Sequence, residues 1–386
     1  MSKTKLFLVL VVAVAVVAAL VILPGCKTTA TTTTAAATTV AETTAAAETT
    51  AAAETTSATE TTTAGGYPYY EKMRAAAQEM TEYPDAPGKN FSLAFTNIMG
   101  GIPFCENVWQ SVQDQWKLAG GDAAKLYYAD NQYDATIGLK NADIMLAKQP
   151  SVLINFQFDS KVNSIIGVKF GAANIPIIAV DVPTPGAPFM GVNNFKVAYM
   201  AGEEAIKDVE AIGGIDKIDK IILMQMPSGG EVVMLRSEGF YQAFVDKYGA
   251  DVIDPKTIRA DGGAGEAEQA NKAMTDVLAK NPDAKTCVLT SINEQTMSGV
   301  ISAIQTAGRW DPEQWIVITQ GCDATGQQQL RDGLTDAAIA YFPEHYGEYL
   351  IPGAVALMNG QNVPAFMYVE NQVITKDNID KFYPKQ

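Results

Sequence analysis

Short apolar runs alternate with longer segments whose apolar residues recur at helical spacing, from Tyr67 almost to the carboxyl terminus. The short runs predict buried strands, and the longer amphipathic segments predict helices. The predicted strands are 91–97, 125–129, 150–156, 175–181, 220–226, 286–291 and 315–319. The predicted helices begin near residues 103, 135, 163, 196, 231, 265, 294 and 327.

This alternation predicts an α/β protein, because strands separated by helices of this length form βαβ units in a parallel sheet. The pattern runs through two successive series. We therefore predict two doubly wound, Rossmann-like lobes. In open sheets of this kind, ligands bind beyond the carboxyl ends of the strands.

Polar and aromatic side chains follow several of the predicted strands. The residues at strand ends are Phe104, Asn155, Asp181, Asn293 and Asp323, and Tyr341 follows the short run DAAIA (336–340). Arg236 lies instead inside the predicted helix 231–249. Carboxylates accept hydrogen bonds, guanidinium donates them and aromatic faces cover apolar ring surfaces, so this set suits a neutral, polyhydroxylated ligand.

The charge balance narrows the ligand class. The formal net charge of the chain is −15, with 28 Lys and Arg against 43 Asp and Glu. A nucleic-acid partner is excluded on this ground, since it needs a basic surface. The seven candidate side chains include one guanidinium and two carboxylates, and this charge sum favours a neutral sugar over a phosphorylated or acidic ligand. No nucleotide-binding motif or metal-ligand spacing occurs, so we expect neither cofactor nor metal.

The amino terminus has the pattern of an export signal. Lys3 and Lys5 precede an unbroken apolar run at 6–23, which is followed by Leu-Pro-Gly-Cys ending at Cys26. The run is long enough for an uncleaved anchor, but the small residue and cysteine resemble a bacterial lipobox. We predict that residues 1–25 are a signal peptide and that Cys26 carries a lipid. Pro24 is unusual in that motif and leaves removal of the peptide open.

Residues 26–66 are almost all Thr, Ala and Glu and have little to bury. We predict a disordered tether between membrane and folded part, with threonine glycosylation as an open alternative. The remaining cysteines, Cys105, Cys287 and Cys322, are odd in number and match no zinc or redox motif, so we expect free thiols.

Two pairs of residues in the sequence suggest catalysis but have plainer interpretations. Asp181 and Asp323 could form a glycosidase acid and base pair, and Cys322 could be a nucleophile if a base lay within reach. The chain has one histidine, His345, in a predicted helix start. Hydroxyl-accepting aspartates and a bystander thiol are the favoured interpretations, and we expect no enzyme.

Several motifs together resemble the ribose/galactose-type periplasmic sugar-binding proteins, which have the type I periplasmic-binding-protein fold. The motifs are INFQFDS (154–160), IPIIAVD (175–181), LRSEGF (235–240), TSINEQ (290–295) and QGCDATG (320–326). Their order and spacing, rather than any single motif, carry the resemblance, which runs from about residue 91 to 373.

The resemblance implies that the seven side chains named above bind the sugar. Four positions differ from the ribose type. Val182 replaces an arginine, Cys105 and Gly262 replace aromatics, and Tyr341 replaces a glutamine. The implied ligand is therefore a pentose or hexose that need not be ribose.

The resemblance also implies two lobes joined by a three-segment hinge near Val192, Phe342 and Tyr368. The N-terminal lobe would comprise 67–192 and 343–368, and the C-terminal lobe 193–342 and 369–386. The expected protein is a monomer that closes around the sugar, outside the cytoplasm in the periplasm or on the outer cell face. It would deliver the sugar to the permease of an ABC importer. Alternatives with the same fold are a quorum-signal furanose or nucleoside as ligand, or a sensory role with a chemoreceptor or kinase.

Overall fold

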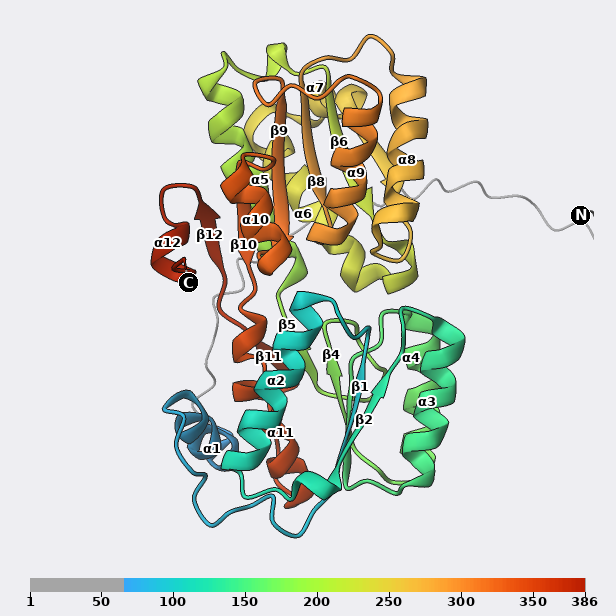
Figure 1. The fold of residues 1–386 in the computed structure, drawn as a ribbon, viewed down its shortest axis with the longest axis vertical. Coiled ribbons are helices and arrows are strands. Elements are labelled where there is room, and N and C mark those ends of the chain that lie inside the picture. Colours follow the sequence, from blue (N-terminus) through green and yellow to red (C-terminus); the bar gives the residue numbers. More distant parts are fainter. Residues whose placement is uncertain (1–65, 386) are drawn as a thin grey trace, which may run out of the picture. The chain divides into compact units, whose positions relative to one another are not determined.

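The computed structural model describes residues 66–385. The predicted signal peptide, Cys26 and the tether up to residue 65 lie outside this range. Within residues 66–385, no helix has the length and apolar character needed to span a membrane. The described residues form two six-stranded sheets, each covered by helices (Figure 1).

The first sheet has the strand order β11-β5-β4-β3-β1-β2, and all its neighbouring strands run parallel. Its strands are β1 (Leu93–Asn97), β2 (Leu126–Asp130), β3 (Val152–Asn155), β4 (Ile177–Val180), β5 (Phe189–Gly191) and β11 (Phe366–Tyr368). The inner strands β1, β3 and β4 are buried along their whole length. That burial is typical of a parallel sheet with helices on both faces.

Two groups of helices cover this sheet. The helices α1 (Pro68–Gln78), α2 (Pro103–Leu118) and α11 (Gly347–Met358) pack together. The helices α3 (Ala135–Ala147) and α4 (Ser160–Ala172) form the second group. Alternate strand residues separate the two cores: Phe95 belongs to the core under α2 and α11, and Ala94 to the core under α3 and α4.

The second sheet has the strand order β12-β10-β9-β8-β6-β7. Its strands are β6 (Lys220–Gln225), β7 (Thr257–Asp261), β8 (Cys287–Ser291), β9 (Trp315–Gly321), β10 (Ala337–Ala340) and β12 (Gln372–Thr375). The strands from β7 to β10 run parallel, whereas β12 pairs antiparallel with β10. The antiparallel edge is a departure from the purely parallel sheet that the sequence predicted.

The second sheet is also covered on both faces. The helices α5 (Asn194–Ala211) and α6 (Glu231–Tyr248) pack against one another, and so do α8 (Ala267–Lys280) and α9 (Glu294–Thr306). Alternate residues of β6 again face different cores, Leu223 with α5 and α6 and Ile222 with α8 and α9. Shorter helices are α7 (Ala250–Ile253), α10 (Ala324–Asp332) and α12 (Ile379–Phe382).

The chain passes between the two sheets three times. It leaves the first sheet after β5, returns after β10 through α11, and crosses again between β11 and β12. We call the unit built on the first sheet the first lobe and the unit built on the second sheet the second lobe. The two α/β lobes confirm the predicted fold class.

The periodicity missed or misplaced several elements. The strands β5, β7, β11 and β12 and the helix α1 were not predicted, and β5 and β11 are too short to show a pattern. The helix expected near Gln327 begins at Ala324 instead, because Asp323 caps it. That correction changes the environment of Asp323, as described below.

Candidate ligand-binding site

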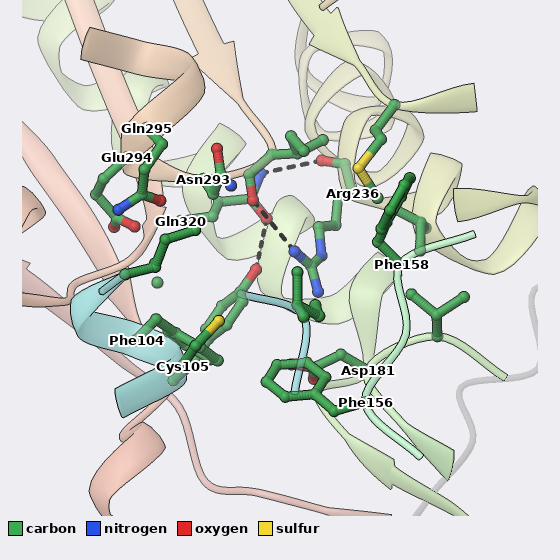
Figure 2. A pocket seen from close by; sticks show the side chains of 18 of the residues that line it. Phe104, Cys105, Phe156, Phe158, Asp181, Arg236, Asn293, Glu294, Gln295 and Gln320 are labelled. Carbon is green, nitrogen blue, oxygen red and sulfur yellow. Dashed lines mark hydrogen bonds between the residues drawn. The ribbon is translucent and has the colours of Figure 1, made fainter. Parts of the chain in front are cut away.

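A cavity of about 70 Å³ lies where the carboxyl ends of strands from both lobes meet. The first lobe contributes residues that follow β1, β2, β3 and β4. The second lobe contributes residues that follow β6, β8 and β10, the last two residues of β9, and one side of α6. Figure 2 shows the side chains that surround it. The location agrees with the rule for open α/β sheets.

Five of the seven predicted ligand-binding residues line this cavity. They are Phe104, Asp181, Arg236, Asn293 and Tyr341. They come from separate parts of the sequence, and the sheet topology brings them together. The other two, Asn155 and Asp323, are buried nearby and are not part of the lining.

Asp181 follows β4 with a left-handed backbone, φ 55°. A Cβ on Gly191 would lie 2.5 Å from Asp181 Oδ1, so the neighbouring strand needs glycine there. The hydroxyl of Tyr346, in the segment that leads into α11, donates to Asp181 Oδ1 at 3.0 Å. Burial raises the pKa of Asp181 to about 6, although the charge of Arg236 and the Tyr346 hydrogen bond lower it. No partner is found for Oδ2 among the described residues.

Arg236 projects from α6 and is held at two points. Its Nε donates to Asn194 Oδ1 at 2.6 Å, and its Nη1 donates to the backbone oxygen of Ile292 at 3.1 Å. The guanidinium also lies over the ring of Tyr341, 5.2 Å from the centroid, in cation–π geometry. Within residues 66–385, Nη2 has no hydrogen-bond partner. The side chain is thus fixed with one donor group left over.

Three further polar side chains of the lining are already bonded to protein. Asn293 caps α9, accepting from the Thr296 amide at 2.9 Å and donating to the Gly265 oxygen at 3.0 Å. The Tyr341 hydroxyl donates to Gln320 Oε1 at 2.9 Å, and Gln320 Nε2 donates to the Arg236 oxygen at 3.1 Å. These bonds make Asn293, Tyr341 and Gln320 a rigid part of the wall.

Aromatic rings form another part of the wall. Phe104, in the first turn of α2, lies edge-on to Tyr346 with 5.5 Å between ring centroids and to Tyr341 with 6.4 Å. Tyr133 and Phe158 also line the cavity, with 5.2 Å between their ring centroids. Such rings provide the apolar faces against which a sugar ring can lie.

Asn155 lies behind the cavity wall. Its Nδ2 donates to Asn163 Oδ1 at 2.8 Å and to Thr184 Oγ1 at 3.0 Å, and its Oδ1 accepts from Thr96 Oγ1 at 3.1 Å. The strand ends at this residue, and the next residue, Phe156, lines the cavity instead. The side chain therefore joins β1 to α4 and to the loop after β4.

The carboxylate of Asp323 is fully engaged by protein donors. Its Oδ1 accepts from the amides of Thr325 and Gly326 at 2.8 and 3.1 Å, the usual role of an N-cap. Its Oδ2 accepts from Gln295 Nε2 at 2.9 Å and from the Phe104 amide at 3.3 Å. This carboxylate connects the two lobes at the edge of the cavity.

Several lining residues were not anticipated from the sequence. They are Ile98, Tyr133, Phe156, Phe158, Met226, Val233, Ile292, Glu294, Gln295, Gln320 and Gly321. Most of them lie within a few residues of a strand end, so a wider window at each end would have found them. Ile292 and Glu294 flank the predicted Asn293 on either side.

Glu294 is the least expected of these. It is 1% exposed, and its Oε1 accepts a 2.5 Å hydrogen bond from the Cys322 amide. Burial, and then the charge of Asp323, raises the pKa of Glu294 well above its ordinary value. A raised pKa favours the neutral acid, which can donate as well as accept hydrogen bonds.

The thiol of Cys322 lacks the features of a nucleophile. It is buried, and burial, then the charges of Glu294 and Asp323, raises its pKa. The reactive thiolate is thereby disfavoured. His345 is paired with Glu348, Nδ1 to Oε1 2.5 Å. Cys105 and Cys287 are likewise free and buried.

The fold and this cavity are those of a solute-binding protein with two α/β lobes. The model of the periplasmic binding protein domain matches residues 93–362, and the chain belongs to that family. Its type I architecture is that of solute-binding proteins rather than enzymes, and family membership places the folded part outside the cytoplasm.

Individual relatives are more distant. The ribose import binding protein RbsB of Salmonella typhimurium is 25% identical over 265 residues, covering 66% of this chain and 83% of that protein. Solved structures share the fold. A periplasmic solute-binding protein of Actinobacillus succinogenes with bound D-allose has a TM-score of 0.61 at 21% identity, covering 76% of this chain and 99% of its own. A solute-binding protein of Mycobacterium smegmatis with bound glycerol has a TM-score of 0.65 at 22% identity, covering 77% of this chain and 98% of its own.

Proposed function

We propose that this protein captures a neutral monosaccharide, a pentose or hexose, in the cavity between its lobes and delivers it to an ABC importer. The observation that carries the proposal is the pair formed by Asp181 and Arg236. Each is held in place by protein contacts and keeps polar atoms free at the cavity. An acceptor beside a fixed donor suits neighbouring sugar hydroxyls, which both donate and accept.

The charges of the side chains that line the cavity support a neutral ligand. Arg236 and Asp181 are opposite charges, and the raised pKa of Glu294 favours its uncharged form. A phosphate or carboxylate on the ligand would meet one guanidinium and the two acids Asp181 and Glu294. The D-allose bound to the solute-binding protein of Actinobacillus succinogenes is a sugar of this class.

Capture would proceed by closure of the lobes about the three connecting segments near residues 192, 342 and 368. Tyr346 connects one of these segments to the cavity. It follows the segment near residue 342, and its hydroxyl donates a hydrogen bond to Asp181. A ligand held by Asp181 on one lobe and Arg236 on the other would stabilise the closed form by its differential contacts.

Isothermal titration with pentoses, hexoses and polyols tests the binding. We expect at least one sugar to bind with micromolar affinity and to lose at least tenfold in affinity in the Asp181→Ala variant. The exposed Asp332→Ala variant is the control, since that carboxylate only accepts from Gln328 at the surface. Failure of every sugar to bind more tightly than millimolar would contradict the proposal.

The anchoring is a separate part of the proposal. Cys26 would carry a lipid and the Thr/Ala/Glu segment would tether the folded part to the membrane. Metabolic labelling with a fatty acid, compared between the full chain and its Cys26→Ser variant, tests this. Label in the full chain that disappears in the variant supports it, and equal label or none in both contradicts it.

A further inference from the structure

One wall of the cavity is made entirely of aliphatic and thioether side chains. Val182, Met226, Val233 and Ile292 form their own contact cluster, each at most 5% exposed, and all four line the cavity. Val182 comes from the first lobe and the other three from the second. We call these four residues the apolar wall.

The apolar wall is adjacent to the charged pair. Val182 directly follows Asp181 in the chain, and Val233 lies one turn before Arg236 on the same side of α6. The backbone oxygen of Ile292 accepts the hydrogen bond from Arg236 Nη1. A ligand that bonds to Asp181 and Arg236 must therefore present its neighbouring substituents to hydrocarbon.

The rest of the lining offers limited hydrogen bonding. The side-chain amides of Asn293 and Gln320 use both their oxygen and their nitrogen on protein partners. Gln295 donates to Asp323, and Glu294 accepts from the Cys322 amide. The polar groups left for a ligand are thus grouped around Asp181, Arg236 and the Glu294–Gln295 corner, which are labelled in Figure 2.

A fully hydroxylated sugar would place a hydroxyl against the apolar wall. A buried hydroxyl without a partner is costly, whereas a methyl or methylene group gains from leaving water. We infer that the ligand is a deoxy sugar, in which a methyl or methylene group replaces a hydroxyl on the side that meets Val182, Met226, Val233 and Ile292. This inference rests on the proposed function and specifies its substrate class.

Titration calorimetry with matched pairs tests it on the intact folded protein. Suitable pairs differ by one hydroxyl: D-fucose with D-galactose, L-rhamnose with L-mannose, D-quinovose with D-glucose, and 2-deoxy-D-ribose with D-ribose. We expect the tightest ligand to be a deoxy sugar that exceeds its hydroxylated partner roughly 5- to 150-fold in affinity, the factor expected for one unpaired buried hydroxyl.

The outcomes separate the two claims. If the tightest-binding sugar is a hydroxylated one, or a deoxy sugar that its hydroxylated partner equals in affinity, the inference is overturned while the proposed function stands. If no sugar of either kind binds, both fail.

Two variants then ask whether the apolar wall sets the preference. Val182→Thr and Val233→Thr keep the side-chain shape and add a hydroxyl that can pair with a ligand hydroxyl. We expect the affinity ratio of deoxy to hydroxylated sugar to fall at least threefold in one of them. Val168→Thr is the control, because Val168 is 74% exposed on α4. An unchanged ratio in both folded wall variants would show that other residues determine the selectivity.

Discussion

The carboxylate of Asp323 accepts a hydrogen bond from the backbone amide of Phe104 at 3.3 Å, across 219 positions of sequence. Asp323 caps α10 in the second lobe, and Phe104 lies in the first turn of α2 in the first lobe. A carboxylate at this end of a helix also interacts favourably with the helix dipole. Asp323 thus caps a helix in its own lobe and accepts a hydrogen bond from the first turn of a helix in the other lobe.

Replacing Asp323 by Asn should weaken this link between the lobes. The carboxylate receives donors at both oxygens, and an amide presents one oxygen and one NH₂ group. Whichever way the amide turns, donors face its nitrogen. We expect sugar affinity to fall by about 1–3 kcal/mol, or roughly 5- to 150-fold, by titration calorimetry. Asp332→Asn, at the exposed end of the same helix, should leave affinity unchanged; equal affinity in Asp323→Asn would refute the link.

Arg236→Lys should be far from conservative. The guanidinium reaches Asn194 Oδ1 and the Ile292 oxygen at once, whereas an ammonium on a flexible stem cannot reproduce that geometry. We expect a loss of about 1–3 kcal/mol in the free energy of unfolding, measured in urea, and at least tenfold weaker sugar binding.

Arg259→Lys is the matched control for that experiment. Arg259 pairs with Glu238 at 3.0 Å, and both side chains are more than a third exposed. Exposed ion pairs contribute about 0–1 kcal/mol, so this variant should change stability little and sugar binding not at all. Equal losses in the two variants would mean that the buried contacts of Arg236 have no special role.

The titration of Asp181 should make stability depend on pH. Burial raises its pKa from 3.8 to about 6 in the folded protein. A raised carboxyl pKa means that the folded state binds more protons between these values, so its contribution to stability is complete below pH 3.8 and is lost as pH rises through 6.

Comparison with Asp181→Asn isolates this contribution, because Asp208, also with a pKa raised to about 6 by burial, titrates in both proteins. Between pH 4 and 8, the unfolding free energy of the natural protein should fall relative to the variant by up to roughly 3 kcal/mol. A relative stability that is flat or increases over this range would disprove the assignment.

Close packing of α5 against α6 makes a strong prediction for Gly239. A Cβ on this residue would lie 2.2 Å from the backbone oxygen of Phe195, which cannot move without shifting α5. We expect Gly239→Ala to lower the free energy of unfolding by about 1–3 kcal/mol, as overpacked cores do.

Gly171→Ala is the control. Gly171 lies in α4 with nothing near a built Cβ, so alanine there should be neutral or stabilise by about 0.4–1 kcal/mol. Urea unfolding measures both variants. If Gly239→Ala were as stable as Gly171→Ala, the two helices could not pack as closely as described.

The fold class followed from the sequence because buried parallel strands are long apolar runs and their helices keep one apolar face. Strands β5 and β11 could not be predicted, because each has three residues and so shows no periodic pattern. Asp181 and Arg236 could be placed at the cavity because a strand end and a helix motif define their positions.

The roles of the side chains were harder to predict. The N-cap bonds of Asn293 and Asp323 are local, but distant partners engage the remaining polar atoms of these two residues and those of Asn155, and no local pattern reveals those partners. The apolar wall could not be predicted either, because it combines Val182 of the first lobe with Met226, Val233 and Ile292 of the second.

The most direct test of the central claim is a crystal structure of residues 66–386 at a saturating concentration of the tightest-binding sugar. Sugar oxygens should lie about 2.7–3.2 Å from Asp181 Oδ2 and Arg236 Nη2, with ring carbons against the rings of Phe104 and Tyr341. A sugar bound elsewhere on the protein, with this cavity unoccupied by it, would contradict the account.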